Sequence, residues 1–306
     1  MSDSWQEKKD KVGSVWISIL VWLTLRVHRK LVLLILWPIS LIFFWVGRDA
    51  TRASKNYLAR IFGRKARWFQ VVKHFYNFAV VSIDRLYFVS GNGKSLNIKF
   101  EDHKVIEDVE NGGCILMVSH IGSFDALRSM AMYSEKLNLK IVMDHQHSVA
   151  IMSVIDGLNT DFAKYIIDSN QPPTALVLEL SEQLKNNVAI GLMADRTTSG
   201  EARVSCDFLG GRVNLPLGPW HLAAILKVPV VLCFAVYEGR GCYSIHAERF
   251  NGDISGSRNQ RSLKLASAAQ EYSNRMAYYL KENPYNWFNF YDFWDEDLSD
   301  AEERTA

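Results

Sequence analysis

The stretch Cys114-Ile-Leu-Met-Val-Ser-His120-Ile-Gly-Ser-Phe-Asp125 sets the pattern for the rest of the chain. Its short continuous apolar run is typical of a buried strand, and the glycine and serine that follow predict a turn. Residues 124–137 are apolar at helical spacing and predict a helix. We therefore expect His120 at the C-terminal end of a strand and Asp125 in the first turn of the next helix.

These positions suggest a catalytic pair. An aspartate in the first helical turn can fold back toward the His120 ring, which gives a general base and an orienting carboxylate without a serine or cysteine nucleophile. The alternative is structural: a strand-end histidine, and an acid that is favoured near a helix N-terminus.

The bulk composition indicates one large domain, or a domain with an appendage. The chain has 306 residues, 48% of them hydrophobic, and a net charge of +2, which is too small to indicate nucleic-acid binding. The four cysteines, Cys114, Cys206, Cys233 and Cys242, show no CxxC spacing. They are expected to be small buried residues in a reducing compartment, which argues against disulfides and a zinc site. We expect no metal and no cofactor.

The N-terminal region is strongly apolar. Residues 15–25 form one apolar run, four of residues 26–30 are basic or histidine, and residues 31–47 carry no charge. A membrane-spanning helix needs about 20 apolar residues, so the second run lies at the lower limit, and Pro38 is expected to kink it. Because no small-residue cleavage site is evident, residues 1–47 predict an uncleaved membrane anchor, either spanning or lying in the interface. A buried helical hairpin is the alternative.

Residues 48–73 are rich in basic side chains. These are Arg48, Arg52, Lys55, Arg60, Arg64, Lys65, Arg67 and Lys73, against the single acid Asp49. Apolar residues recur between them at helical spacing, which predicts a basic amphipathic helix for an anionic membrane surface or an acidic partner. An ordinary solvated helix is the alternative. The larger basic load after the apolar run favours a cytoplasmic C-terminal domain.

From residue 96 onward, strand and helix patterns alternate. Strands are expected at 96–100, 114–120, 140–143, 165–167, 188–193, 228–236 and, as an exposed or edge strand, 243–249; helices are expected at 149–158, 172–185, 222–227 and 262–280. This alternation predicts an α/β fold with a mostly parallel sheet and helices on both faces. Reactive groups collect at the carboxyl ends of such strands, where we expect His120, Asp195 and Arg196. Arg203 and Arg212 are expected in the loops that follow.

The predicted organisation has four parts: the anchor at 1–47, the basic helical segment at 48–100, a catalytic core at 101–294 and an acidic tail at 295–306.

The spacing of His120 and Asp125 resembles the HX4D/E motif of the lysophospholipid acyltransferase superfamily. Three more stretches resemble its late (lauroyl/myristoyl) lipid A acyltransferase branch: Gly191-Leu-Met-Ala-Asp-Arg196 with Phe208-Leu-Gly-Gly211, Pro216-Leu-Gly-Pro219 with Val228-Pro-Val230, and Asn283-Pro-Tyr-Asn-Trp287. An N-terminal hydrophobic anchor is also typical of that branch. The resemblance covers roughly residues 15–290.

The resemblance implies a glycerol-phosphate-acyltransferase-like fold and an acyltransferase. Such an enzyme would move a fatty acyl group from acyl carrier protein or coenzyme A onto a hydroxyl or amine of a membrane lipid. His120 would be the general base and Asp125 would orient it, with no covalent enzyme intermediate. The backbone amides of Gly122 or Ser123 would be oxyanion donors at a helix N-terminus.

Asp195 and Arg196 are further candidate substrate-binding residues, with Arg196 suited to a phosphate of either substrate. A surface turn is the structural alternative for this pair. His145 and His147 have no third ligand at fixed spacing, so a metal site there is not expected.

Three stretches depart from the branch. These are 143–147, which lacks its arginine; Arg196, where lipid A enzymes tend to have another acid or histidine; and 287–294, which differs from the Trp-x-x-x-Arg ending. They suggest a sibling enzyme with another acceptor, such as those of aryl-polyene pathways or ornithine-type lipids. A thioesterase of the same fold and an inactive lipid-binding scaffold remain open as alternatives.

Overall fold

The computed structural model describes residues 26–90, 96–133, 137–144, 162–197 and 200–294. The apolar run at 15–25, the helix expected at 149–158, His145 and His147 lie outside the described residues.

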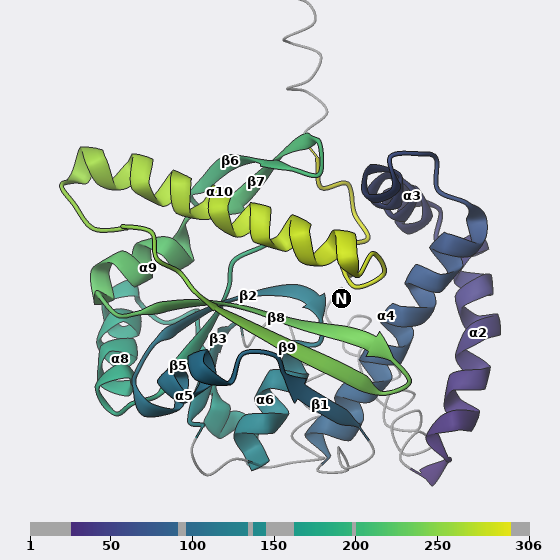
Figure 1. Cartoon of the computed structure of the whole chain (residues 1–306), viewed down its shortest axis with the longest axis horizontal. Helices are drawn as coiled ribbons and strands as arrows, with labels where there is room; N and C mark the ends of the chain where they lie inside the picture. Colours follow the sequence, from purple (N-terminus) through teal and green to yellow (C-terminus); the bar gives the residue numbers. More distant parts are fainter. Residues whose placement is uncertain (1–25, 91–95, 134–136, 145–161, 198–199, 295–306) are drawn as a thin grey trace, which may run out of the picture.

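A seven-stranded sheet forms the centre of the molecule (Figure 1). In spatial order its strands are β1 (Asn97–Phe100), β9 (Cys242–Arg249), β8 (Val230–Gly239), β2 (Ile115–Gly122), β5 (Ala189–Met193), β3 (Leu139–Met143) and β4 (Ile166–Asp168). All neighbouring pairs are parallel except β8 with β9. The predicted mostly parallel α/β sheet is therefore confirmed.

The prediction of an edge position for the strand at 243–249 is wrong. β9 lies between β1 and β8, and both Tyr243 and its neighbour Ser244 are buried. The chain reverses tightly at Gly239–Gly241, where three successive residues have positive φ, so β9 pairs antiparallel with β8. β1 pairs with the other side of β9 and forms one edge of the sheet. The order of strands in the sequence does not reveal this arrangement.

Helices cover both faces of the sheet, because successive strand side chains point to opposite sides. On one face α8 (Pro173–Lys185), α9 (Gly218–Leu226) and α10 (Arg258–Glu282) share a core with Ile115 and Met117 of β2. On the other face α5 (His103–Asn111) and α6 (Phe124–Tyr133) pack on Leu116 and Val118.

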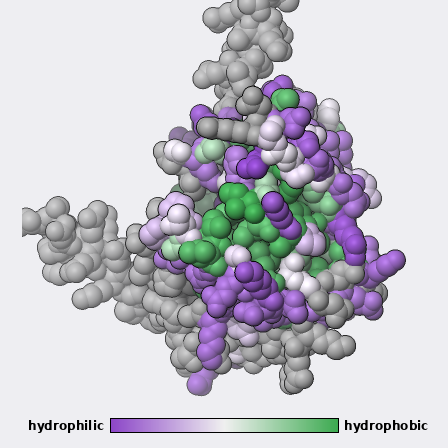
Figure 2. All heavy atoms as spheres, turned by 90° about the vertical axis from the view of Figure 1, so that its left-hand side faces the viewer, coloured by the Kyte–Doolittle hydropathy of each residue, from purple (hydrophilic) through white to green (hydrophobic). Residues whose placement is uncertain are grey.

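Apolar side chains also gather on the surface at the end of the molecule that carries α8 and α9 (Figure 2). The exposed large apolar residues of those helices include Leu178 of α8, Ile225 of α9 and Leu263 of α10.

The basic segment forms two helices, so the prediction of one amphipathic helix is wrong. α3 (Arg48–Phe62) ends at Gly63, which has φ +61°, and α4 (Trp68–Val89) begins after Arg67. The Gln70 side chain accepts a hydrogen bond from the Arg67 amide at 2.8 Å, which caps the new helix. A left-handed glycine followed by a capped start ends one helix and begins another in a different direction.

The apolar run at 31–47 forms α2 (Arg29–Val46), which contains Pro38 and packs beside α4 (Figure 1). Among the described residues α2 is the one helix long and apolar enough to cross a bilayer, a test that core helices and signal sequences also pass.

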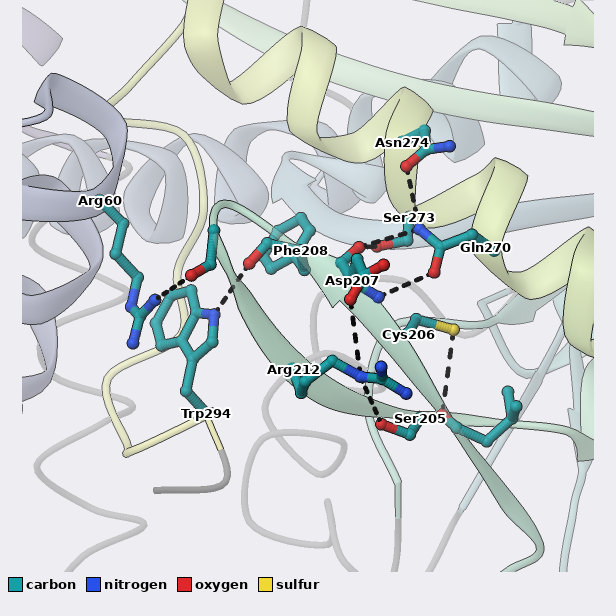
Figure 3. Close-up of polar contacts among 12 residues, drawn as sticks. Arg60, Ser205, Cys206, Asp207, Phe208, Arg212, Gln270, Ser273, Asn274 and Trp294 are labelled. Carbon is teal, nitrogen blue, oxygen red and sulfur yellow. Dashed lines mark hydrogen bonds and ion pairs between the residues drawn. The ribbon is translucent and has the colours of Figure 1, made fainter. Parts of the chain in front are cut away.

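A two-stranded hairpin, β6 (Arg203–Phe208) and β7 (Gly211–Pro216), replaces the loops expected there. Arg203 and Arg212 therefore lie in strands. The turn at Leu209-Gly210 has two positive φ angles, which suits a tight hairpin. α10 holds this hairpin through Gln270 and Ser273, both of which donate to the Asp207 carbonyl (Figure 3).

Candidate active site

His120 lies near the carboxyl end of β2, beside the end of β5. The parallel register pairs Val118 with Met193, and the Ala194 amide donates to the Val118 carbonyl at 2.9 Å. This pairing brings the next residue, Asp195, directly to His120. The His120 side chain is 33% exposed and the Asp195 side chain is fully buried, so the ring lies at the boundary between core and solvent.

Asp195 holds His120 with both carboxylate oxygens. Oδ1 lies 2.9 Å from the imidazole Nδ1, and Oδ2 accepts from the His120 backbone amide at 2.9 Å. Because an ionised carboxylate only accepts, Nδ1 must carry the proton, which leaves the lone pair on Nε2. This arrangement fixes the ring and its tautomer as a general base requires.

The expected contact between Asp125 and the His120 ring is wrong. Asp125 pairs with Arg85 of α4 at 3.0 Å and with Arg128 of its own helix at 2.8 Å. After the turn at Gly122–Ser123, α6 packs against α4, so the first-turn carboxylate meets Arg85 and the arginine one turn ahead. The residue that orients the ring comes from the neighbouring strand, not from the following helix.

The two backbone amides expected to bind an oxyanion both donate hydrogen bonds to carbonyl groups of the protein. The Gly122 amide donates to the Asn286 carbonyl at 2.7 Å, and the Ser123 amide donates to the Ala235 carbonyl at 2.8 Å. The Ser123 hydroxyl is buried and has no hydrogen-bond partner in the part of the chain that the structure describes.

A C-terminal strap, residues 283–294, crosses the end of β2. Trp287 forms a β-bridge with Ile121, and the Phe288 amide donates to the His120 carbonyl at 3.4 Å. Arg196 holds the strap at the same residue, because its Nη2 donates to the Phe288 carbonyl at 2.7 Å. No residue pattern in the sequence indicates the contact of this strap with His120.

Hydrogen bonds at Trp287 and Trp294 also hold the strap on both sides of Phe288. Buried His74 of α4 lies with Nε2 2.8 Å from the Trp287 carbonyl and Nδ1 2.9 Å from the Ser54 hydroxyl. Burial lowers the pKa of His74 to about 4, with the Trp287 carbonyl opposing, so the ring is neutral at physiological pH. At the far end the Trp294 indole donates to the Phe208 carbonyl at 3.0 Å, and Arg60 lies over the indole ring (Figure 3).

The pKa of Asp195 lies below its usual value. Burial alone raises this pKa, but the charge and hydrogen bonds of His120, together with the charge of Arg196, outweigh burial. A carboxylate with a depressed folded-state pKa stabilises the fold fully above its unfolded value of about 3.9. That contribution is lost as the pH falls through the folded-state pKa, so the pair is intact at physiological pH.

Comparison with known families gives a match over nearly the whole chain. The family model for bacterial lipid A biosynthesis acyltransferases matches residues 2–295. The chain belongs to this family. No curated protein matches the chain. Membership confirms the resemblance drawn from the sequence motifs: the protein is an acyltransferase that acts on lipid-like acceptors.

Gly122, two residues after His120, is a position where the backbone geometry admits no side chain. Its φ is +60°, and a Cβ there would lie 1.9 Å from the Ala235 carbonyl oxygen. Gly63 offers a matched control, because its φ is +61° and nothing lies within 4 Å of its Cβ position.

We predict that Gly63→Ala lowers the free energy of unfolding by only about 1–2 kcal/mol, the strain of a left-handed residue. Gly122→Ala should lower it further and also reduce kcat, since β2 must move away from β8 beside His120. Chemical denaturation and initial rates check both variants. Equal stability and full activity in the two would contradict the close approach at Gly122.

Proposed function

We propose that this protein transfers a fatty acyl group from an acyl thioester to a hydroxyl or amine of a lipid-like acceptor, with His120 as the general base. The observation that carries the proposal is the His120–Asp195 pair at the carboxyl ends of β2 and β5. The proposed acceptor is a lipid A-like molecule or another bacterial lipid, including an aryl-polyene lipid, and the donor is acyl carrier protein or coenzyme A.

In this mechanism the acceptor oxygen or nitrogen attacks the thioester carbonyl carbon while Nε2 of His120 takes its proton. Buried Asp195 stabilises the imidazolium that forms. The tetrahedral intermediate then collapses, the carbon–sulfur bond breaks, and the leaving thiolate takes the proton back from His120.

Direct attack by the acceptor fits the cysteines of the chain. Cys114, Cys206 and Cys233 are buried. Burial raises the pKa of Cys114 and of Cys233 to about 12, so neither is a thiolate at neutral pH. Cys114 and Cys233 are therefore poorly suited to form a covalent acyl-cysteine intermediate.

The variants His120→Ala, Asp195→Asn and Asp125→Asn test the mechanism. We expect His120→Ala and Asp195→Asn each to lower kcat by roughly 10²–10⁴, the usual contribution of a positioned general base. Asp125→Asn should lower kcat less than Asp195→Asn, because its carboxylate contacts arginines and not the ring. The measurement is transfer of labelled acyl groups, from acyl carrier protein and from coenzyme A, to a bacterial lipid extract, followed by mass spectrometry.

Full transfer by His120→Ala would refute the general base. A larger loss for Asp125→Asn than for Asp195→Asn would show that the motif aspartate orients the ring during the reaction. Free fatty acid as the main product, with lipid acceptor present, would favour the thioesterase alternative.

We further propose that α2 lies in the membrane interface at the cytoplasmic face of a bacterial inner membrane. Its inner side is bound along its length to α4: Arg29 pairs with Asp84 at 2.7 Å, Trp37 stacks on Tyr76, and Phe43 meets Phe75 edge-on. Because α4 also packs on the catalytic core, a spanning α2 would carry that core into the bilayer.

The outer side of α2 is apolar and exposed; Leu34 is 68% and Trp45 72% exposed. Trp68 and Phe69 at the start of α4 are exposed as well, and α3 adds the exposed Arg48, Arg52 and Lys55. Apolar residues bordered by basic ones suit the surface of an anionic bilayer.

Environment-sensitive labels at Leu34→Cys and Trp45→Cys test this placement, in a Cys242→Ser background because the other three cysteines are buried. Both labels should lie at the same shallow depth in vesicles, as measured with lipid-borne quenchers. The two positions are about 16 Å apart along the helix axis. A depth difference of that size would show that α2 spans the bilayer instead.

We also propose that the basic surface of Arg64, Lys65 and Arg67 docks acidic acyl carrier protein. All three side chains are exposed. Arg60 is unsuitable for testing this proposal, because it donates to the Gly210 carbonyl at 3.2 Å and lies over Trp294.

The double variant Arg64→Glu and Lys65→Glu should raise KM for acyl carrier protein roughly tenfold and leave kcat unchanged, because opposite charges steer association. The KM for acyl-coenzyme A, measured on the same variant, is the first control. The second control is the double variant Lys104→Glu and Lys185→Glu, which makes the same change of net charge at exposed positions of α5 and α8. An unchanged KM for acyl carrier protein would contradict docking at this surface.

A further inference from the structure

The Tyr272 side chain of α10 reaches the strand that carries His120. Tyr272 is fully buried, and its hydroxyl donates to the Val118 carbonyl of β2 at 2.7 Å. The Ala194 amide, just beyond β5, donates to the same carbonyl at 2.9 Å. Since a carbonyl oxygen has two lone pairs, this one acceptor is shared between a side chain of α10 and the backbone of the neighbouring strand.

The Val118 carbonyl lies where β2 leaves its regular pairing. On one side the register with β5 ends at Val118 and Met193, and on the other side the register with β8 shifts between Val118 and Gly122. His120 lies within this irregular stretch, and its backbone amide donates to the Asp195 carboxylate. The position of the His120 ring therefore depends on how the chain is held at Val118, two residues earlier.

The Tyr272 phenol is also close to Asp195. Burial raises the pKa of Tyr272 well above its usual value and the negative charge of Asp195 adds to that rise, while a hydrogen bond with the Ser119 hydroxyl opposes it. The phenol therefore keeps its proton at physiological pH and remains a hydrogen-bond donor.

Aromatic packing fixes the ring of Tyr272. The ring stacks on Phe234 of β8, with centroids 5.9 Å apart, and meets Trp220 of α9 edge-on at 6.2 Å. These contacts need only an aromatic ring, so a phenylalanine would also make them. Because buried phenols usually find a partner, the structural alternative is that the bond to Val118 serves the fold alone.

We propose that Tyr272 is a positioning residue for acyl transfer, whose hydroxyl fixes the Val118 carbonyl and thereby aligns Asp195 with the His120 ring. This carbonyl is bonded to the amide of Ala194, the residue immediately before Asp195, and lies two residues before His120. Movement of this one group would therefore displace both members of the pair. The inference rests on the proposed general-base mechanism.

Tyr279 offers a matched control on the same helix. It lies about two turns after Tyr272 and packs on the same Phe234 ring, at 4.7 Å. Its hydroxyl donates to the Glu248 carboxylate of β9 and not to β2. Loss of either hydroxyl removes a hydrogen bond of α10 to the sheet, but of the two only Tyr272 contacts the strand of His120.

The variants are Tyr272→Phe and Tyr279→Phe, and the measurements are Tm, the kcat and KM of acyl transfer, and the proton NMR resonance of the His120 Nδ1 proton. The absence of this resonance in His120→Ala assigns it. Tyr272→Phe should lower kcat roughly tenfold at unchanged KM, because misalignment of a catalytic group slows the chemical step. It should also shift or broaden the resonance. Tyr279→Phe should change neither, although both variants should lower Tm.

Both substitutions are also combined with Asp195→Asn. If Tyr272 acts through Asp195, Tyr272→Phe should have little further effect on kcat in that background, because changes that act on one shared interaction are not additive. A tyrosine that serves only the fold would lower kcat by the same factor in both backgrounds.

A kcat and a resonance in Tyr272→Phe equal to those of Tyr279→Phe would overturn the inference, as would a loss of kcat that multiplies with that of Asp195→Asn. If Tyr272→Phe does not fold, 3-fluorotyrosine at position 272 keeps the ring and the hydroxyl but alters the donor strength. The resonance should then still move, and an unmoved resonance would overturn the inference.

The resonance is measured without substrate, so it separates this inference from the proposed function. Absence of transfer by the unaltered protein, or full transfer by His120→Ala, would refute the proposed function. The resonance would still report whether Tyr272 aligns the His120–Asp195 pair.

Discussion

The register between β2 and β5 is the constraint on which the site depends. The Ala194 amide bonds to the Val118 carbonyl, and this pairing brings Asp195 to the backbone and the ring of His120 at once. A slip of one residue along either strand would reverse every side chain and move the carboxylate away from the imidazole. The apolar residues that alternate along β2 between two cores therefore hold the catalytic geometry in place as well as the fold.

Much of the fold could be predicted from the order of apolar runs and turns. Alternating strand and helix patterns gave the parallel sheet, and the position of His120 at a strand end was also predictable, because local periodicity determines both. The place of β9 inside the sheet could not be predicted, since it depends on the Gly239–Gly241 reversal and on β1, which lies far away in the sequence. The break at Gly63 was missed because the basic and apolar residues continue their helical spacing through it.

The positions of His120 and Asp195 at neighbouring strand ends could be predicted from the sequence, but their pairing could not. Asp125 follows His120 closely in sequence, which made it the obvious partner, but proximity in sequence does not decide which way a helical side chain points. Arg85 and Arg128 attract Asp125, and the parallel neighbour strand supplies Asp195.

The C-terminal strap also has a consequence for the order in which the protein is made. It closes the end of β2 through bonds to His120 and Gly122, and it is fastened by His74 and Trp294. A ribosome produces the sheet and the His120–Asp195 pair well before it adds these last residues. The nascent chain therefore lacks these contacts at the end of β2 until residue 294 has emerged.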